Sequence, residues 1–174
     1  MKKILQTLLV AFALAVTVTA PAASFREITW LELVPKDWKP QDRLDRKKAA
    51  SLADGDALAQ EMMKELREIL DTAPTVAAMN GVSIRMPGYV VPLEQTRDGI
   101  SEFLLVPYHG ACIHTPPPPA NQIVHVKAAG PLKGVQSMSA VWVTGVLRTV
   151  RKDSGMGVSG YALDLAGIEP YRPN

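Results

Sequence analysis

Apolar side chains recur at two different periods along the chain, and the period changes near residue 80. Between residues 49 and 71 they fall at steps of three and four, so they share one face of a helix. This stripe consists of Leu58, Met62, Leu66, Ile69 and Leu70. We expect Asp54 or Asp56 to cap the start of the helix, and Pro74 ends the pattern.

From Asn80-Gly81 onward, the apolar residues form short runs of β-type composition that Gly, Pro and Asp separate. These runs are Val82–Met86, Tyr89–Leu93, Phe103–Val106, Ile123–Val126, Val141–Val150 and Tyr161–Leu165. The connections between them are turn-like, which predicts antiparallel pairing. Gly145 interrupts the longest run, as a bulge or a barrel bend would.

These elements predict a mostly β fold of the α+β class. The best match is a small, partly open, OB-like antiparallel barrel, with the helix packed on one face or at one end. A β-sandwich and a mixed α+β sheet remain open as alternatives. The barrel is expected over residues 80–174. Residues 23–79 are expected to form an N-terminal arm and the helix, with Trp30 and Leu33 as apolar anchors of the arm.

The first 22 residues have the three parts of a secretory signal peptide. Lys2 and Lys3 form a basic start, residues 4–19 are apolar and uncharged, and Ala20-Pro21-Ala22 suits a signal peptidase. A retained membrane anchor is the alternative, but the apolar run falls short of the ~20 residues that span a bilayer. We therefore expect cleavage near Ala22, a periplasmic location and no membrane span in the mature chain.

The net charge of the chain belongs to this signal. The full chain carries 19 Lys and Arg against 17 Asp and Glu, and removal of Lys2 and Lys3 leaves 17 of each. Nucleic acids and anionic membranes both select basic surfaces. The balanced charge of the mature chain therefore argues against either of them as the main partner.

The chain has a single cysteine, Cys112, and two of its three histidines, His109 and His114, lie within three residues of it. Exported proteins usually use cysteines in pairs, so a lone cysteine is a packed apolar residue, an intermolecular bridge or a functional thiol. In an extended segment, Cys112 and His114 point to the same side. His109 could return through the turn that Gly110 permits, and His125 could approach from the next strand.

One thiolate with two or three imidazoles is a ligand set that suits Zn²⁺, with copper as an alternative. The four prolines at 116–119 would stiffen the loop. Asn121 and Gln122 are candidates for hydrogen bonds that orient a ligand, and Tyr108 is a further candidate at the site. The spacing matches no paired Cys-x-x-Cys zinc motif, so ordinary packing of Cys112 stays open.

A thiol enzyme is one alternative. An imidazole such as His114 would activate Cys112, but no orienting carboxylate is evident in the sequence. The nearby acidic residues Glu94, Asp98 and Glu102 are expected to form a solvated turn.

A metal-free interaction module is another alternative. In this case Tyr108, Pro116–Pro119 and Trp142 would form a docking surface for a second envelope protein. The hypothesis requires the prolines to form an exposed apolar loop.

Several segments have an unusual sequence that carries a family resemblance. They are residues 85–94 and 103–108, the stretch Gly110-Ala111-Cys112-Ile113-His114, the four prolines, Asn121-Gln122, and also residues 28–30 and 168–171. Together they resemble a family of exported bacterial proteins catalogued as a domain of unknown function. Some members of that family are encoded near ABC transporter components associated with zinc supply. The resemblance implies metal binding with Cys112 and His114 as the functional pair, and the family often has an aromatic residue in place of His109.

The sequence thus predicts a periplasmic accessory protein that binds a transition metal, with zinc the first choice. Cys112 and His114 would be the central ligands, with His109 or His125 completing the set. The protein would serve metal delivery or an ABC-type transporter component and would not catalyse a reaction.

Overall fold

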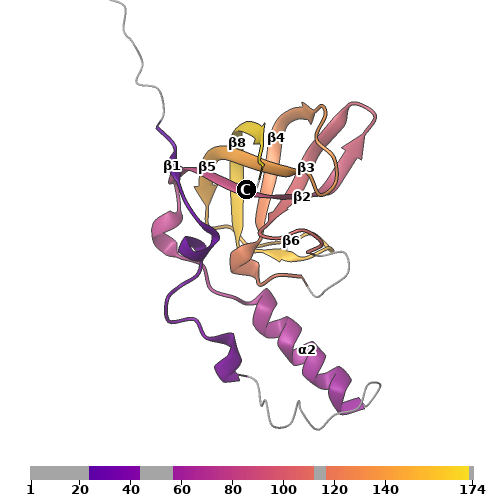
Figure 1. Cartoon of the computed structure of the whole chain (residues 1–174). Helices are drawn as coiled ribbons and strands as arrows, with labels where there is room; N and C mark the ends of the chain where they lie inside the picture. The colour runs from indigo at the N-terminus through magenta and orange to yellow at the C-terminus, as the bar shows by residue number, and fades with distance from the viewer. Residues whose placement is uncertain (1–23, 44–56, 112–116, 173–174) are drawn as a thin grey trace, which may run out of the picture.

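The computed structural model describes residues 24–43, 57–111 and 117–172, and five strands within these ranges close into a barrel (Figure 1). The strands are β1 (Arg26–Glu27), β2 (Ser83–Thr96), β3 (Gly99–Val106), β4 (Val124–Leu132), β5 (Ala140–Arg148), β6 (Lys152–Asp153), β7 (Val158–Ser159) and β8 (Tyr161–Pro170). The helices are the 3-10 helices η1 (Trp30–Leu33), η2 (Pro40–Arg43), η3 (Ala77–Met79) and η4 (Ala120–Gln122), and the α-helix α2 (Ala57–Asp71). None of the helices in these ranges is long and apolar enough to cross a membrane.

The barrel strands follow the order β2-β3-β4-β8-β5, and β5 pairs with β2 to close the barrel. The long strand β2 pairs with two neighbours: residues 83–89 pair with β5, and residues 89–96 pair with β3. The apolar runs on either side of Pro87-Gly88 therefore belong to one long strand. The prediction of a mostly β, OB-like barrel with one helix is confirmed for the described part of the chain, and the barrel is closed rather than partly open.

The barrel pairings in the described residues are antiparallel except that β4 and β8 run parallel. These two strands are not consecutive, since β5 and the β6–β7 hairpin lie between them, so turn-like connections could not predict how they pair. Gly145 lies at a register shift between β5 and β8, as its position in the sequence suggested. An added Cβ at Gly145 would overlap the carbonyl oxygen of Asp164.

Alternate side chains of the barrel strands form two separate apolar clusters. Those that point inward form the main core, which includes Phe103 and Tyr161. A second cluster contains side chains that point outward from β2 and β3, together with residues of the segment that follows β3. We call it the outer cluster. It consists of Val91, Leu104, Val106, Ala111 and Ile123. Because Ala111 directly precedes Cys112, the start of the predicted site rests on the outer face of the barrel.

The N-terminal arm is tied to the barrel by apolar contacts and hydrogen bonds. Leu33 is fully buried in the main core, and the indole N–H of Trp30 donates to the carbonyl of Pro87 at 2.8 Å. The hydroxyl of Tyr161 donates to the carbonyl of Leu33 at 2.8 Å and accepts from the N–H of Val76 at 2.7 Å. One buried hydroxyl therefore joins the arm, the segment after α2 and the last barrel strand.

Helix α2 meets the barrel at its C-terminal end. The carbonyl of Ala73 accepts from Arg151 at 3.1 Å, and the carbonyl of Pro74 accepts from the side-chain amide of Asn121 at 3.0 Å. Ile69, near this end, is buried. The rest of α2 projects away from the barrel in Figure 1, and the other described members of its apolar stripe are only half-buried.

Candidate functional site

The segment between β3 and η4 is described at both ends but not in its centre. Cys112 and His114 lie outside the described residues, together with Pro116. On one side of the gap, Ala111 is fully buried in the outer cluster, and on the other side Pro118 is buried. Residues packed against the protein therefore bracket the two predicted metal ligands.

His109 lies at the rim of the outer cluster, on the side of β2. It is exposed, and its ring packs edge-on against Tyr89 with centroids 5.7 Å apart and an interplanar angle of 88°. Gly110 has a φ of +84°, a conformation that favours glycine and turns the chain back toward the barrel. Its N–H donates to the sulfur of Met138 at 3.4 Å.

His125 has a different environment, because it is only 6% exposed and contacts two charged side chains. Its Nε2 is 2.5 Å from Oε1 of Glu102 on β3. The ammonium of Lys152, on β6, is 2.6 Å from the same oxygen and 2.9 Å from Nε2. Glu102, His125 and Lys152 thus form one polar group on the outer face of the barrel, which we call the polar triad.

The hydrogen-bond chemistry of the polar triad constrains the proton position on His125. A carboxylate can only accept and an ammonium can only donate, and Lys152 donates to Glu102. An N–H on Nε2 of His125 suits the 2.5 Å contact with Glu102, whereas a lone pair there suits the 2.9 Å contact with Lys152. We assign the N–H to Nε2, because the contact with the carboxylate is the shorter one. In the neutral ring this leaves the lone pair on Nδ1, the nitrogen that can bind a metal ion or accept a proton.

Glu102 is held in its charged form by its two partners. The hydrogen bond from Lys152 lowers the pKa of Glu102 below its usual value of 4.5, and the hydrogen bond from His125 adds to this effect. Burial acts in the opposite direction and raises the pKa, but the net shift is downward. The side chain is 22% exposed, so solvent screens part of these interactions.

His125 and Ala111, the last residue before the undescribed segment, are each linked to Leu104 on β3. His125 lies opposite Leu104 in the β3–β4 pairing, and Leu104 packs in the same cluster as Ala111. His109 is farther from His125. The ring of His109 packs against Tyr89 on β2, whereas His125 is on β4, and β3 lies between these two strands. Two strand spacings correspond to ~10 Å. Among the described residues, no group of three or more His, Cys, Asp or Glu side chains is placed to hold a metal ion.

The other predicted site residues have structural contacts in the described part of the chain. Asn121 is fully buried and donates to the backbone of Pro74, while its Oδ1 has no hydrogen-bond partner within that part. Gln122 is half-buried next to it and belongs to η4. Tyr108 is 47% exposed. The described hydrogen bond of Asn121 therefore anchors the segment after α2.

The described residues of the surface that the interaction-module hypothesis requires differ in exposure, and Tyr108 is the most exposed of them. Pro118 is buried, and Pro117 and Pro119 are half-buried. Trp142 is also occupied within the chain, because the guanidinium of Arg85 stacks 3.8 Å above its ring and Tyr171 packs edge-on at 5.2 Å.

Sequence reasoning missed Glu102 and Lys152. Glu102 was expected in a solvated turn with other acids, but strand alternation from Phe103 and Leu105 places it on the outer face, and this signal was present in the sequence. Its contact with His125 depends on the β3–β4 register, which includes a shift between Ile100 and Glu102. Lys152 comes from a two-residue strand in a connection with no strand pattern.

The fold and the site together define a class: a small closed barrel of the OB type that carries a carboxylate–imidazole–ammonium group on its outer face, in which the imidazole is buried. A family model described as "Protein of unknown function (DUF3299)" matches residues 30–170. The chain therefore belongs to the DUF3299 family.

A solved member of this family has a similar structure. The crystal structure of a DUF3299 family protein from Pseudomonas aeruginosa PAO1 is 35% identical in sequence and superimposes with a TM-score of 0.67. The match covers 87% of this chain and 99% of the other. None of the curated proteins matches the chain.

Proposed function

We propose that this protein is an exported accessory protein that binds a transition metal, with Zn²⁺ as the preferred ion, through Cys112, His114 and His125. The observation that carries the proposal is the hydrogen bond between Glu102 and His125. Metal-binding histidines usually donate their second ring N–H to a carboxylate, which fixes the tautomer and the direction of the ring. His125 has this partner, so its Nδ1 is the expected ligand atom.

Lys152 has a supporting role in this arrangement. Its ammonium hydrogen bonds to Glu102 and lowers the pKa of that carboxyl, so Glu102 is ionised at neutral pH and accepts from Nε2. The charges of Glu102 and Lys152 balance one another. A cation that binds on the far side of the imidazole ring therefore meets a locally neutral pair rather than an uncompensated ammonium.

The chain supplies the remaining ligands in the segment that follows Ala111. A cysteine thiolate and a neutral imidazole are both ligand types that zinc accepts. Ala111 belongs to the same apolar cluster as Leu104, and Leu104 lies opposite His125 in the β3–β4 pairing. His109 is assigned a minor role, because it packs against Tyr89 two strands away from His125.

Export and delivery belong to the same proposal. The signal-like residues 1–22 support a periplasmic location. The family resemblance supports a transporter component of the ABC type as the partner. Metal delivery does not require catalysis, so we assign no reaction to the protein.

The test is a zinc titration by calorimetry on residues 23–174 under reducing conditions. We expect Cys112→Ser and His125→Gln to abolish tight binding, and Glu102→Gln to weaken it by about 10–100-fold, because Glu102 only orients the ligand. Glu94→Gln is the matched control, since Glu94 bonds to Ser101 at the neighbouring turn. Equal affinities in the parent and all four variants, or no binding by the parent, would rule out the site.

A thiol enzyme is the second candidate function, and the same hydrogen bond favours it. A cysteine nucleophile needs a base, and the base is commonly oriented by a third group. Glu102 provides this group for His125, although the sequence suggested none. In that case iodoacetamide should label Cys112 rapidly at neutral pH, and His125→Gln should slow the labelling. A slow reaction in both proteins, typical of an unperturbed thiol, would exclude the enzyme.

A further inference from the structure

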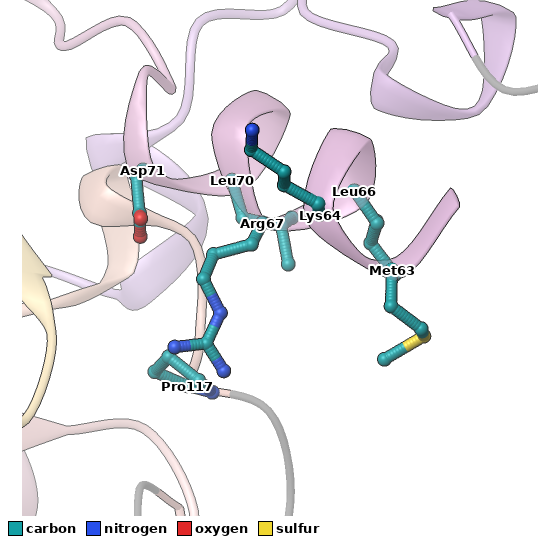
Figure 2. A pocket seen from close by; sticks show the side chains of 7 residues that line it. All are labelled: Met63, Lys64, Leu66, Arg67, Leu70, Asp71 and Pro117. Atoms are coloured by element: carbon teal, nitrogen blue, oxygen red, sulfur yellow. The ribbon is translucent and has the colours of Figure 1, made fainter. Parts of the chain in front are cut away.

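A groove of about 260 Å³ runs along the part of α2 that projects from the barrel, between the helix and Pro117 (Figure 2). Its floor is apolar, with Met63, Leu66 and Leu70 at steps of three and four along one helix face. Met63 is 53% exposed. An exposed apolar strip of this kind on a helix is typical of a surface that packs against another helix.

The charges on the edge of this groove have opposite signs at its two ends. Lys64 and Asp71 both line the groove, and they lie seven residues apart, which is two helical turns on the same side of α2. No ion pair within the described residues involves either of them. Arg67, halfway between them, also lines the groove, and its side chain extends from α2 to Pro117 in Figure 2.

This pattern is complementary to itself under a two-fold rotation. If a second α2 is laid antiparallel across the first, with the crossing point near residues 67 and 68, the Lys64 end of each helix meets the Asp71 end of the other. The central leucines, Leu66 and Leu70, then pack against the same residues of the second helix.

We propose that the groove is occupied by α2 of a second copy of this chain, in an antiparallel pair that two reciprocal Lys64–Asp71 ion pairs fix in register. A partner of one charge sign would suit one end of the groove and be repelled by the other, whereas a second copy suits both. The proposal is independent of metal binding.

The short length of α2 predicts a weak dimer. Fifteen residues of α-helix span ~22 Å, which is short for an interface of the standard ~1,600 Å². We therefore expect a dissociation constant on the order of micromolar, so that monomer and dimer are both populated in the range of ordinary sedimentation experiments.

The test is sedimentation velocity over a concentration series of residues 23–174. Lys64→Asp and Asp71→Lys should each weaken the dimer at least about fivefold, because each replaces two attractions by two repulsions. The double variant should restore the dissociation constant of the parent to within about twofold. Glu65→Lys is the matched control, since this exposed residue does not line the groove and its reversal should leave the dimer unchanged.

The outcomes separate the possibilities. Restoration in the double variant with no effect of Glu65→Lys supports the antiparallel pair. A parent chain that remains monomeric at all concentrations overturns it and leaves a different partner as the occupant of the groove. A dimer that the two single variants do not weaken, or that the double variant does not restore, also overturns it, because the contact then lies elsewhere.

Discussion

Removal of a single oxygen atom, in Tyr161→Phe, should destabilise the protein by an amount that follows from two hydrogen bonds. The ring of Tyr161 is completely buried in the main core, and a phenylalanine ring fills the same space. The hydroxyl alone contacts the backbone at two places, the carbonyl of Leu33 and the N–H of Val76. The substitution therefore leaves packing intact and removes the shared partner of the arm and the segment after α2.

The expected loss is ~2–4 kcal/mol. A buried polar group that loses its partner costs ~1–3 kcal/mol, and the substitution leaves two such groups. Water can reach one of them, the N–H of Val76, because Val76 is half-buried, so the cost of this group falls at the lower end of the range. Folded domains are stable by only ~5–15 kcal/mol, so the change is large. The effect should be specific to the attachment of the arm, because strand pairing in β8 does not involve the hydroxyl.

Urea unfolding at equilibrium, followed by tryptophan fluorescence, measures this change. The matched control is Tyr89→Phe, the same chemical change at a residue whose hydroxyl makes no hydrogen bond among the described residues. We expect the control to lie within ~0.5 kcal/mol of the parent. A loss below ~0.5 kcal/mol for Tyr161→Phe would refute the reasoning, since it would mean that the two backbone groups find other partners at no cost.

The same residue should also affect the alkaline limit of stability. Burial raises the pKa of Tyr161 above its usual value of 10.0, and the hydrogen bond from Val76 offsets this only in part. A raised pKa means that the neutral hydroxyl stabilises the fold fully below about pH 10, and that this contribution is lost as the pH rises through the folded pKa. The parent should therefore lose stability above pH 10 more steeply than Tyr161→Phe does.

Two further predictions concern the polar triad and the β5 bulge. Because the pKa of Glu102 is lowered from 4.5, its contribution to stability is present above about pH 4.5 and is lost as the pH falls through the lower folded pKa. Thermal unfolding of Glu102→Gln should therefore vary less between pH 5 and pH 3 than that of the parent, and parallel curves would contradict the assignment. Gly145→Ala should lower the free energy of unfolding in urea by ~1–3 kcal/mol, because its Cβ would overlap the backbone of Asp164. Gly130→Ala, where an added Cβ meets nothing within 4 Å, should have little effect, and equal losses at the two sites would argue against the overlap.

The local pattern of the sequence was sufficient for the strands but not for their arrangement. Alternation located the apolar runs, and Gly145 indicated the bulge. Pro87-Gly88 read as a break between two strands, yet β2 continues through it. The carbonyl of Pro87 faces Trp30 and not β5, so the missing N–H of the proline, which would point the same way, removes no hydrogen bond to β5. The parallel pairing of β4 with β8 joins distant segments, and nothing local specifies it.

The candidate site was predictable only in part for the same reason. His125 was selected from its residue type and its position after the proline run, which are properties of the sequence. Its partners Glu102 and Lys152 are 23 and 27 residues away, and they meet it only through strand register and the β6–β7 hairpin. The acidic residues near the β2–β3 turn looked equivalent in the sequence. Their environments differ because strand alternation and register place Glu102 beside His125, whereas Glu94 is exposed and bonds to Ser101.

The outer face of β3 and β4 also limits the kind of ligand that the barrel can take. In OB barrels the face of the second and third strands is a common binding surface for oligonucleotides and oligosaccharides. Here Leu104 and Val106 on this face are fully buried within the outer cluster, and Lys152 reaches over it from the β6–β7 hairpin. An extended polymer would have to displace the protein's own side chains, which would expose that apolar surface to water. The covered face therefore argues against an extended polymer as a ligand at this surface.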